Sequence, residues 1–507
     1  MMNRRQYAFR NISVMLSTYV VTTLLSFIVR AIFVRQLGSQ YLGLNGVFSS
    51  VLSVLSISDL GMESVFAFLL YKPLAQKNND VVRDFIALFR KIYNLVGLFI
   101  FVAGVLLIPF LPSIIGEQGK GLKHVFLIYL ILLINSAGSY LFTYNRTILN
   151  ANQKNYVITT VNFILVTIIN LAQIVFLFFV HSMVVYVALL LISTFTTNII
   201  LSRIVLKQYP FLHQLPKHPR ISPSSKKILW HNTVGGLSNK LGSIIVFASD
   251  NILLSIFVDL TMVGLYSNYT MILNSLSGLI TKVFATLTAG IGNLSVQAPD
   301  RALGIFEKLN FYITVVAFFS APQLLTLLRP LINFWLGNHY VLSQYIVLLI
   351  VINFVLQISR QPALTYIDAY GLQWVQKWKS IIESALNIVF SLIALIFFHL
   401  GLMGILLGTI GSTVLFVLWY EPFIVLKHAL QMEGKARNIA LIQVLLEKLW
   451  LLVPTIMTWS TMHYFQGSGI IFLIQLMLVN FLISLLLFLL IFSRTDEMKS
   501  IYQIFQK

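Results

Sequence analysis

The most regular feature of the sequence is a succession of long apolar segments separated by short polar breaks. A helix needs about 20 apolar residues to cross the hydrocarbon core of a bilayer, and fourteen segments reach that length. The pattern predicts an all-α polytopic membrane protein with 14 transmembrane helices. The predicted spans are 11–35, 43–70, 86–110, 123–145, 156–180, 183–206, 229–257, 263–289, 309–329, 341–367, 377–399, 402–426, 438–462 and 469–493.

The composition agrees with a bilayer as the solvent of this chain. Of its 507 residues, 58% are hydrophobic and 10% are charged, with a mean hydropathy of +0.86, whereas soluble domains carry about 25% charged residues. The absence of cysteine excludes disulfides and thiolate metal sites. The sequence has no phosphate-binding loop motif, and its nine histidines show no metal-ligand spacing. We therefore predict a protein that is not an enzyme and carries no cofactor or metal.

The charge distribution predicts the orientation. The chain has 35 Lys and Arg against 16 Asp and Glu, and most of the basic residues fall in alternate loops and at the termini. If the N-terminus is inside, the outer loops keep only Lys120, Lys123 and Arg329. The positive-inside rule then places both termini in the cytoplasm. The basic excess is explained by the membrane, and no nucleic-acid partner is expected.

One polar stretch divides the chain. Residues 207–228 are basic and contain four prolines, which prevent a continuous helix. We predict a cytoplasmic linker here between an N-lobe of six spans (1–206) and a C-lobe of six spans (229–430). Residues 431–507 hold the last two spans and the tail.

A weak internal repeat suggests that the two lobes are related. Residues 37–44 resemble residues 258–265, each ending in a Gly-Leu pair, and Pro109 precedes Gly116 by the same seven positions as Pro330 precedes Gly337. The copies lie an even number of predicted spans apart, so they share one orientation. This is the arrangement of a parallel repeat about an axis along the membrane normal, which some transporters have.

Ionisable residues inside the predicted spans are the candidate functional residues, because a charge at membrane depth is costly unless it faces a partner or a wet cavity. Salt bridges that join helices are the alternative explanation. The substrate-binding candidates are Arg30, Lys240, Arg360 and Asp250, and the weaker candidates are Arg35, Asp59, Glu63 and Lys282.

Several short stretches carry a resemblance to a known family. They include the segments 30–38, 41–48, 59–61 and 71–75, and then 249–257, 263–269, 291–294, 368–371, 407–410 and 419–422, with Glu383 and Asn387. In this order they resemble bacterial polysaccharide repeat-unit flippases, of the type that serves Gram-positive capsules and exopolysaccharides. These proteins belong to the multidrug/oligosaccharidyl-lipid/polysaccharide exporter superfamily. The resemblance covers about residues 1–430.

The resemblance implies two six-helix lobes around a central cavity that opens alternately to each side of the bacterial cytoplasmic membrane. It implies that the substrate is an undecaprenyl-diphosphate-linked oligosaccharide moved from the inner to the outer leaflet, with Arg30 holding the diphosphate. A polysaccharide polymerase and an initiating sugar transferase are the implied partners, and a monomer is expected. Ala31 and the segment 373–376 depart from the acidic residues of related flippases, so coupling to H⁺ or Na⁺ stays open.

Three other functions are compatible with parts of this pattern. A lipid II flippase of cell-wall synthesis differs from a polysaccharide repeat-unit flippase only in the headgroup of its substrate. A cation-coupled multidrug exporter of the same superfamily predicts an acidic lumen, whereas the intramembrane charges here are more often basic. A membrane glycosyltransferase or polymerase needs a large outer loop with carboxylates, and the predicted outer loops are short.

Overall fold

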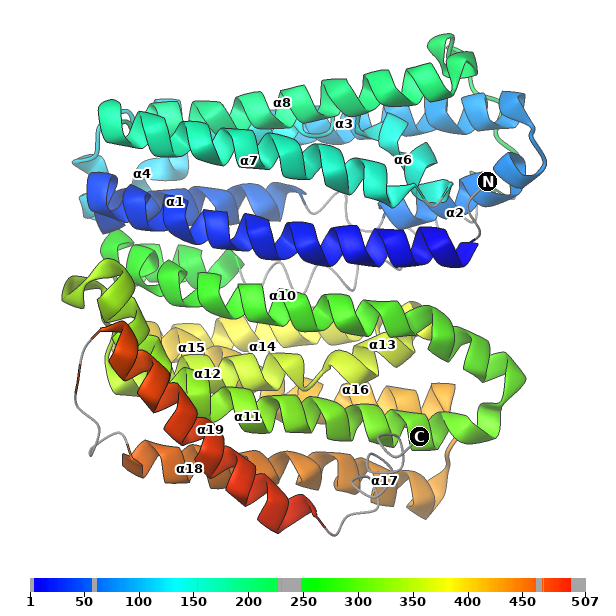
Figure 1. Cartoon of the computed structure of the whole chain (residues 1–507). Coiled ribbons are helices and arrows are strands. Elements are labelled where there is room, and N and C mark those ends of the chain that lie inside the picture. The colour runs from blue at the N-terminus through cyan, green and yellow to red at the C-terminus, as the bar shows by residue number, and fades with distance from the viewer. Residues whose placement is uncertain are drawn as a thin grey trace. The chain divides into compact units, whose positions relative to one another are not determined.

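The computed structural model describes residues 4–56, 62–152, 154–223, 225–226, 229, 248–461, 467 and 469–493. Within these ranges the chain is helical and contains no strand (Figure 1). Eleven helices in this part of the chain are long and apolar enough to cross a membrane, or twelve if one bent pair forms a single span. The prediction of an all-α polytopic membrane protein is confirmed. The count of fourteen stays a prediction, since most of the predicted span 229–257 lies outside the described residues.

The first two predicted spans are joined without a loop. Element α1 (Arg4–Leu55) consists of two helices that meet at Gly38, where φ is 83° and ψ is 176°. Only glycine adopts this region without steric cost, so Gly38 lets two helices follow each other directly. The predicted spans 11–35 and 43–70 are thus separated by a break at a single residue, Gly38.

In the described part of the chain up to residue 208, seven more α-helices follow α1. They are α2 (Met62–Ala75), α3 (Asn79–Leu107), α4 (Leu111–Lys120), α5 (Val125–Gly138), α6 (Thr143–Ala151), α7 (Asn155–Phe179) and α8 (Met183–Gln208). Four of them, α3, α4, α5 and α7, pack against α1. Helix α7 lies against α1 and α8, and α5 lies against α3 and α8. Helices α5 and α6 meet at an angle of 44° and together cover the fourth predicted span.

The C-terminal half is equally helical. Its main elements are α10 (Leu260–Gln297), α11 (Ala302–Leu336), α12 (Gln344–Ile358), α13 (Gln361–Ala369), α14 (Lys377–Ile396), α15 (Leu402–Ser412), α16 (Leu418–Ile424), α17 (Gly434–Leu446), α18 (Leu452–Thr461) and α19 (Ile470–Phe492). Helix α14 packs along α15, and α11 packs against α12 and α19. Two π-helical turns, η7 (Thr413–Val417) and η8 (Val425–Ala429), flank α16.

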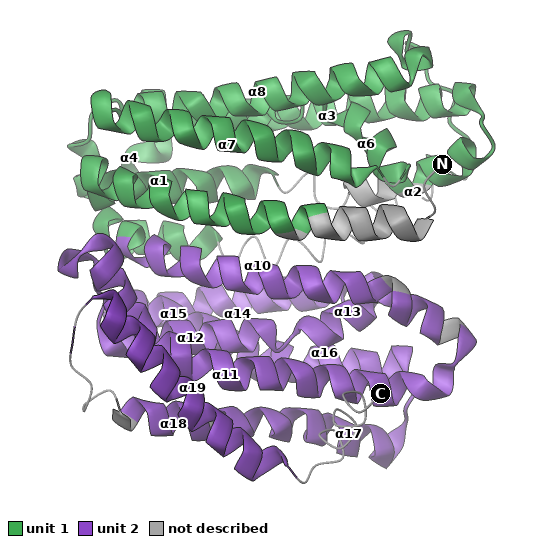
Figure 2. Cartoon of the chain, viewed as in Figure 1, with its two compact units in different colours: residues 1–264 green, residues 265–507 purple. Residues whose placement is uncertain are grey.

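The chain divides into two compact units, residues 1–264 and 265–507 (Figure 2). The boundary lies inside α10, because the short helix Ala248–Phe257 and the first turn of α10 pack with the N-terminal unit. Helix α8 ends at Gln208 and a short helical turn, η3 (Pro210–His213), follows it. The assignment of residues 207–228 as the linker between two lobes stays a prediction.

The internal repeat has a structural counterpart. Residues 39–43 and 260–264 are equivalent in the two copies, and they cross each other closely: a Cβ atom on Gly43 would overlap the carbonyl of Leu260, and one on Gly264 would overlap the carbonyl of Ser39. The contact is reciprocal, as a two-fold relation between the copies requires. Each copy thus uses its glycine to receive the backbone of the other.

Candidate functional site

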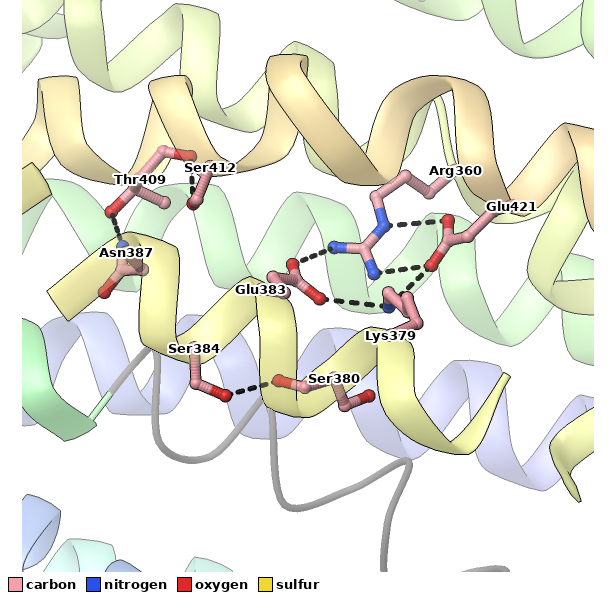
Figure 3. A network of polar contacts seen from close by, with 9 residues as sticks. All are labelled: Arg360, Lys379, Ser380, Glu383, Ser384, Asn387, Thr409, Ser412 and Glu421. Carbon is pink, nitrogen blue, oxygen red and sulfur yellow. Dashed lines mark hydrogen bonds and ion pairs between the residues drawn. The ribbon is translucent and has the colours of Figure 1, made fainter. Parts of the chain in front are cut away.

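The most concentrated charge inside the C-terminal unit is a group of four side chains, which we call the C-unit ion network: Arg360, Lys379, Glu383 and Glu421 (Figure 3). Arg360 donates to Glu421 from Nε at 3.0 Å and from Nη2 at 2.7 Å, and to Glu383 from Nη1 at 3.2 Å. Lys379 Nζ lies 3.0 Å from Glu383 Oε2 and 2.7 Å from Glu421 Oε1.

Three separate elements bring these side chains together. Arg360 precedes α13 at the break between α12 and α13, where Pro362 opens the new helix. Lys379 and Glu383 are four residues apart on α14 and so share one face of it. Glu421 lies on α16 and has no exposed surface, while Lys379 and Glu383 are each 5% exposed. The network therefore lies deep inside the unit, at positions that belong to apolar spans.

The network is balanced in charge. Two cations face two carboxylates, and each carboxylate contacts both cations. At this depth the balance matters, because an uncompensated buried charge costs several kcal/mol. The arrangement joins α13, α14 and α16 and satisfies three of the five N–H groups of Arg360.

A row of uncharged polar groups continues from the network along α14 toward α15 (Figure 3). Asn387 donates from Nδ2 to Thr409 Oγ1 at 2.9 Å, and Ser412 donates to the Thr409 carbonyl at 3.0 Å. Ser384 donates to the carbonyl of Ser380. All five side chains are buried, so α14 presents to its neighbours a polar face that is about two turns long.

In the N-terminal unit, Arg30 is the basic candidate at membrane depth. It lies half-buried in the first helix of α1, eight residues before the break at Gly38, and interacts electrostatically with Tyr186 of α8. The ring of Phe33, one turn further along α1, lies 4.8 Å from the Tyr186 ring. Gln173 of α7 donates to the Tyr186 carbonyl at 3.3 Å. Arg30 therefore lies where α1, α7 and α8 meet.

The other predicted residues that the structure describes lie on different helices. Asp250 is buried in the helix Ala248–Phe257. The residue after it, Asn251, donates from Nδ2 to Ser50 Oγ at 2.9 Å. Arg35 is exposed on α1, Lys282 is half-buried on α10 and Glu63 belongs to α2. Lys240 and Asp59 lie outside the described residues.

Sequence reasoning missed three of the four network residues. Lys379 was assigned to an inner loop by the charge count, and Glu383 and Glu421 entered only through the family resemblance. A usable signal was present, because Lys379 and Glu383 are spaced as an i,i+4 pair and Glu421 interrupts an apolar run. Among the described residues, no group of three or more His, Cys, Asp or Glu could hold a metal ion.

Neither the comparison with protein-family models nor the search of curated proteins gave a match. Solved structures do match over nearly the whole chain. The lipid II flippase MurJ in an inward closed conformation is 14% identical, with a TM-score of 0.65, and the match covers 94% of this chain and 98% of MurJ.

Two multidrug transporters match less well. An inward-facing MATE transporter of the MOP superfamily is 13% identical with a TM-score of 0.52, covering 89% of this chain and 99% of its own. The eukaryotic MATE transporter AtDTX14 is 14% identical with a TM-score of 0.52, covering 86% of this chain and 97% of its own. The chain is thus a multi-pass membrane protein with the fold shared by the MurJ flippase and the MATE transporters.

Proposed function

We propose that this protein is a flippase that moves undecaprenyl-diphosphate-linked oligosaccharide repeat units from the inner to the outer leaflet of the bacterial cytoplasmic membrane. It works by alternating access through a cationic lumen, and its product feeds capsule or exopolysaccharide synthesis. A polymerase and an initiating sugar transferase are the proposed partners, and the proposed working unit is a monomer.

The observation that carries the proposal is the position of Arg30. A guanidinium within a membrane-spanning helix is expensive unless it serves a polar ligand or a polar path. Its planar fork of donors matches phosphate oxygens. The neighbouring Tyr186 offers a hydroxyl as a further donor for a phosphate oxygen. We assign to Arg30 the diphosphate of the substrate.

The remaining basic and acidic candidates complete the proposed lumen. Lys240 and Arg360 are proposed to contact the diphosphate or the sugars, together with Asp250. Arg360 keeps two of its donor groups on Glu421 and one on Glu383, so a ligand there would contact its two remaining N–H groups. The weaker candidates are Arg35, Asp59, Glu63 and Lys282.

The chemistry of the substrate explains why such a lumen is needed. Moving one hydroxyl from water to a hydrocarbon costs about 4–8 kcal/mol, and an ion costs about 20 kcal/mol by a Born calculation. A polar path with fixed cations lowers both barriers, while the polyprenyl tail stays in lipid. An inside-negative potential favours outward movement of an anion by about 2.3 kcal/mol per charge and 100 mV.

The fold also hosts proteins with other substrates. The similarity to MurJ supports a lipid-linked substrate and leaves lipid II as the alternative headgroup. The MATE similarity keeps a multidrug exporter as the second alternative. Because one fold serves many functions, the substrate has to be decided by measurement.

The deciding experiment deletes the gene and assays lipid-linked oligosaccharide on each membrane face, with a sugar-binding lectin on intact cells and on inverted vesicles. The proposal predicts accumulation on the inner face and loss of surface polymer. A normal distribution with new drug sensitivity would favour the exporter. Accumulation of lipid II would favour the cell-wall flippase.

The residue assignment is tested separately. Arg30→Ala should abolish surface polysaccharide at a normal membrane level of the protein, and Arg30→Lys should retain part of the export because the charge remains. Arg203→Ala, an exposed arginine on α8, is the matched control. Export by Arg30→Ala at the wild-type rate would make Arg30 structural.

A further inference from the structure

Helix α16 and the turn η7 before it carry an unusual group of aromatic rings, on the side of the helix opposite Glu421. Four of them, Phe416, Trp419, Tyr420 and Phe423, are spaced as i, i+3, i+4 and i+7, so they form one stripe along the helix. Phe416 stacks on Tyr420 with ring centroids 4.9 Å apart, and Trp419 lies 6.0 Å from Phe416 and 6.3 Å from Phe423. We call these four residues the aromatic column.

Two cations close one end of the column. The guanidinium of Arg437, at the start of α17, lies 4.7 Å from the centre of the Phe423 ring, and Lys427 Nζ lies 5.9 Å from it. Lys427 is exposed and Arg437 is half-buried. We call Lys427 and Arg437 the basic pair. The charge distribution predicts that this end of the helix is cytoplasmic.

The local backbone holds the column outward. Glu421 and Pro422 are buried on the opposite side of α16, where Glu421 binds Arg360 and Lys379. The π-helical turns η7 and η8 begin and end this segment, and such turns are frequent at functional sites. Trp419 is 37% exposed and its Nε1 donates to the Leu415 carbonyl at 2.9 Å, which fixes the indole against the helix.

From these observations we propose that the aromatic column and the basic pair form a binding site for an isoprenoid diphosphate lipid. The basic pair holds the phosphates, and the rings of the column pack against the first isoprene units of the tail. The column covers seven residue steps, about 10 Å of helix, against a hydrocarbon core of about 30 Å. The column therefore contacts only the part of the tail next to the phosphates.

The chemistry separates this ligand from ordinary lipids. The isoprene units pack against the aromatic rings by dispersion, as other apolar chains also do, so the difference lies in the phosphates. Two cations on one ring match two phosphoryl groups, and arginine pairs with phosphate through a bidentate fork. This inference rests on the proposed function, for which it would be the place where the lipid carrier docks from the inner leaflet.

The test measures binding to the purified full chain in nanodiscs, without transport. The probe is geranylgeranyl diphosphate with a benzophenone on its tail, which is crosslinked by light and mapped by peptide mass spectrometry. The wild-type protein should crosslink within 414–442. Arg437→Gln and Trp419→Leu should each weaken binding at least about tenfold, the loss expected when one charge-assisted contact or one large apolar contact is removed.

Matched controls come from the chain itself. Trp378 is 61% exposed and lies near another lysine, Lys377, whose Nζ is 5.9 Å from its ring. Trp378→Leu and Lys377→Gln remove a similar aromatic and cation from a different surface and should leave binding unchanged. Equal losses of probe binding in both sets of variants would overturn the assignment of the binding site to the aromatic column and the basic pair.

Competition decides the ligand class. Unlabelled geranylgeranyl diphosphate should displace the probe, while phosphatidylglycerol, geranylgeraniol and inorganic diphosphate at the same concentration should not. Displacement by phosphatidylglycerol would make this face an ordinary interfacial anchor and overturn the proposal. Displacement by inorganic diphosphate alone would overturn the role of the column. Specific binding combined with a normal lectin distribution in the deletion strain would refute the flippase function and leave this site standing.

Discussion

Removal of the Glu421 carboxylate tests whether the C-unit ion network stabilises the fold through its balance of charge. This side chain is fully buried and accepts from Arg360 at 3.0 and 2.7 Å and from Lys379 at 2.7 Å. Glu421→Gln keeps the shape but leaves two buried cations facing one carboxylate, Glu383. Breaking a buried ion pair costs about 3–5 kcal/mol, which lowers the ratio of folded to unfolded protein by roughly 10²- to 10³-fold or more.

The charge-balance reasoning makes a sharper prediction for the double variant. Glu421→Gln with Lys379→Met leaves Arg360 facing Glu383, one charge of each sign, so the double variant should recover about half or more of the loss. Neighbouring residues are expected to be non-additive in this way. The control is Glu117→Gln, whose carboxylate is 87% exposed and pairs with Lys120; exposed pairs contribute little.

The free energy of unfolding would be measured in mixed micelles with increasing denaturing detergent, followed by tryptophan fluorescence. A single variant as stable as the wild type would refute a stabilising role for Glu421. A double variant that loses the sum of the two single losses would refute charge balance as the cause.

Two further substitutions test packing and hydrogen bonding. Gly43→Ala should reduce stability or expression, because its Cβ would overlap the Leu260 carbonyl. The control Gly304→Ala has open space around its Cβ and should raise helix stability by about 0.5–1 kcal/mol. Thermal unfolding of both variants in detergent measures the difference, and an unaffected Gly43→Ala would contradict the close crossing. Tyr269→Phe should cost about 1–3 kcal/mol, because the buried backbone N–H of Leu342 donates to the Tyr269 hydroxyl at 2.8 Å and would lose its acceptor; a variant unfolding at the wild-type detergent concentration would contradict that.

Hydropathy alone was sufficient for the fold class. Apolar runs of about 20 residues leave a helix as the only way to satisfy the backbone in lipid, so the sequence itself determined an all-helical membrane protein. The glycines of the repeat also carried local information: Gly116 and Gly337, seven residues after their prolines, both have positive φ. The Gly38 kink was not predicted, because a polar break of a few residues fits a loop as well as a kinked helix.

The charged residues show where the sequence stops being informative. It indicated that Arg360 needs a partner or a wet cavity at membrane depth, since that follows from the cost of a charge in hydrocarbon. It did not indicate that the partners are Glu383 and Glu421, 23 and 61 residues further along the chain. Only the packing of α13, α14 and α16 brings these carboxylates within hydrogen-bond distance, because pairing depends on which helix faces meet, and many packings satisfy the same apolar pattern.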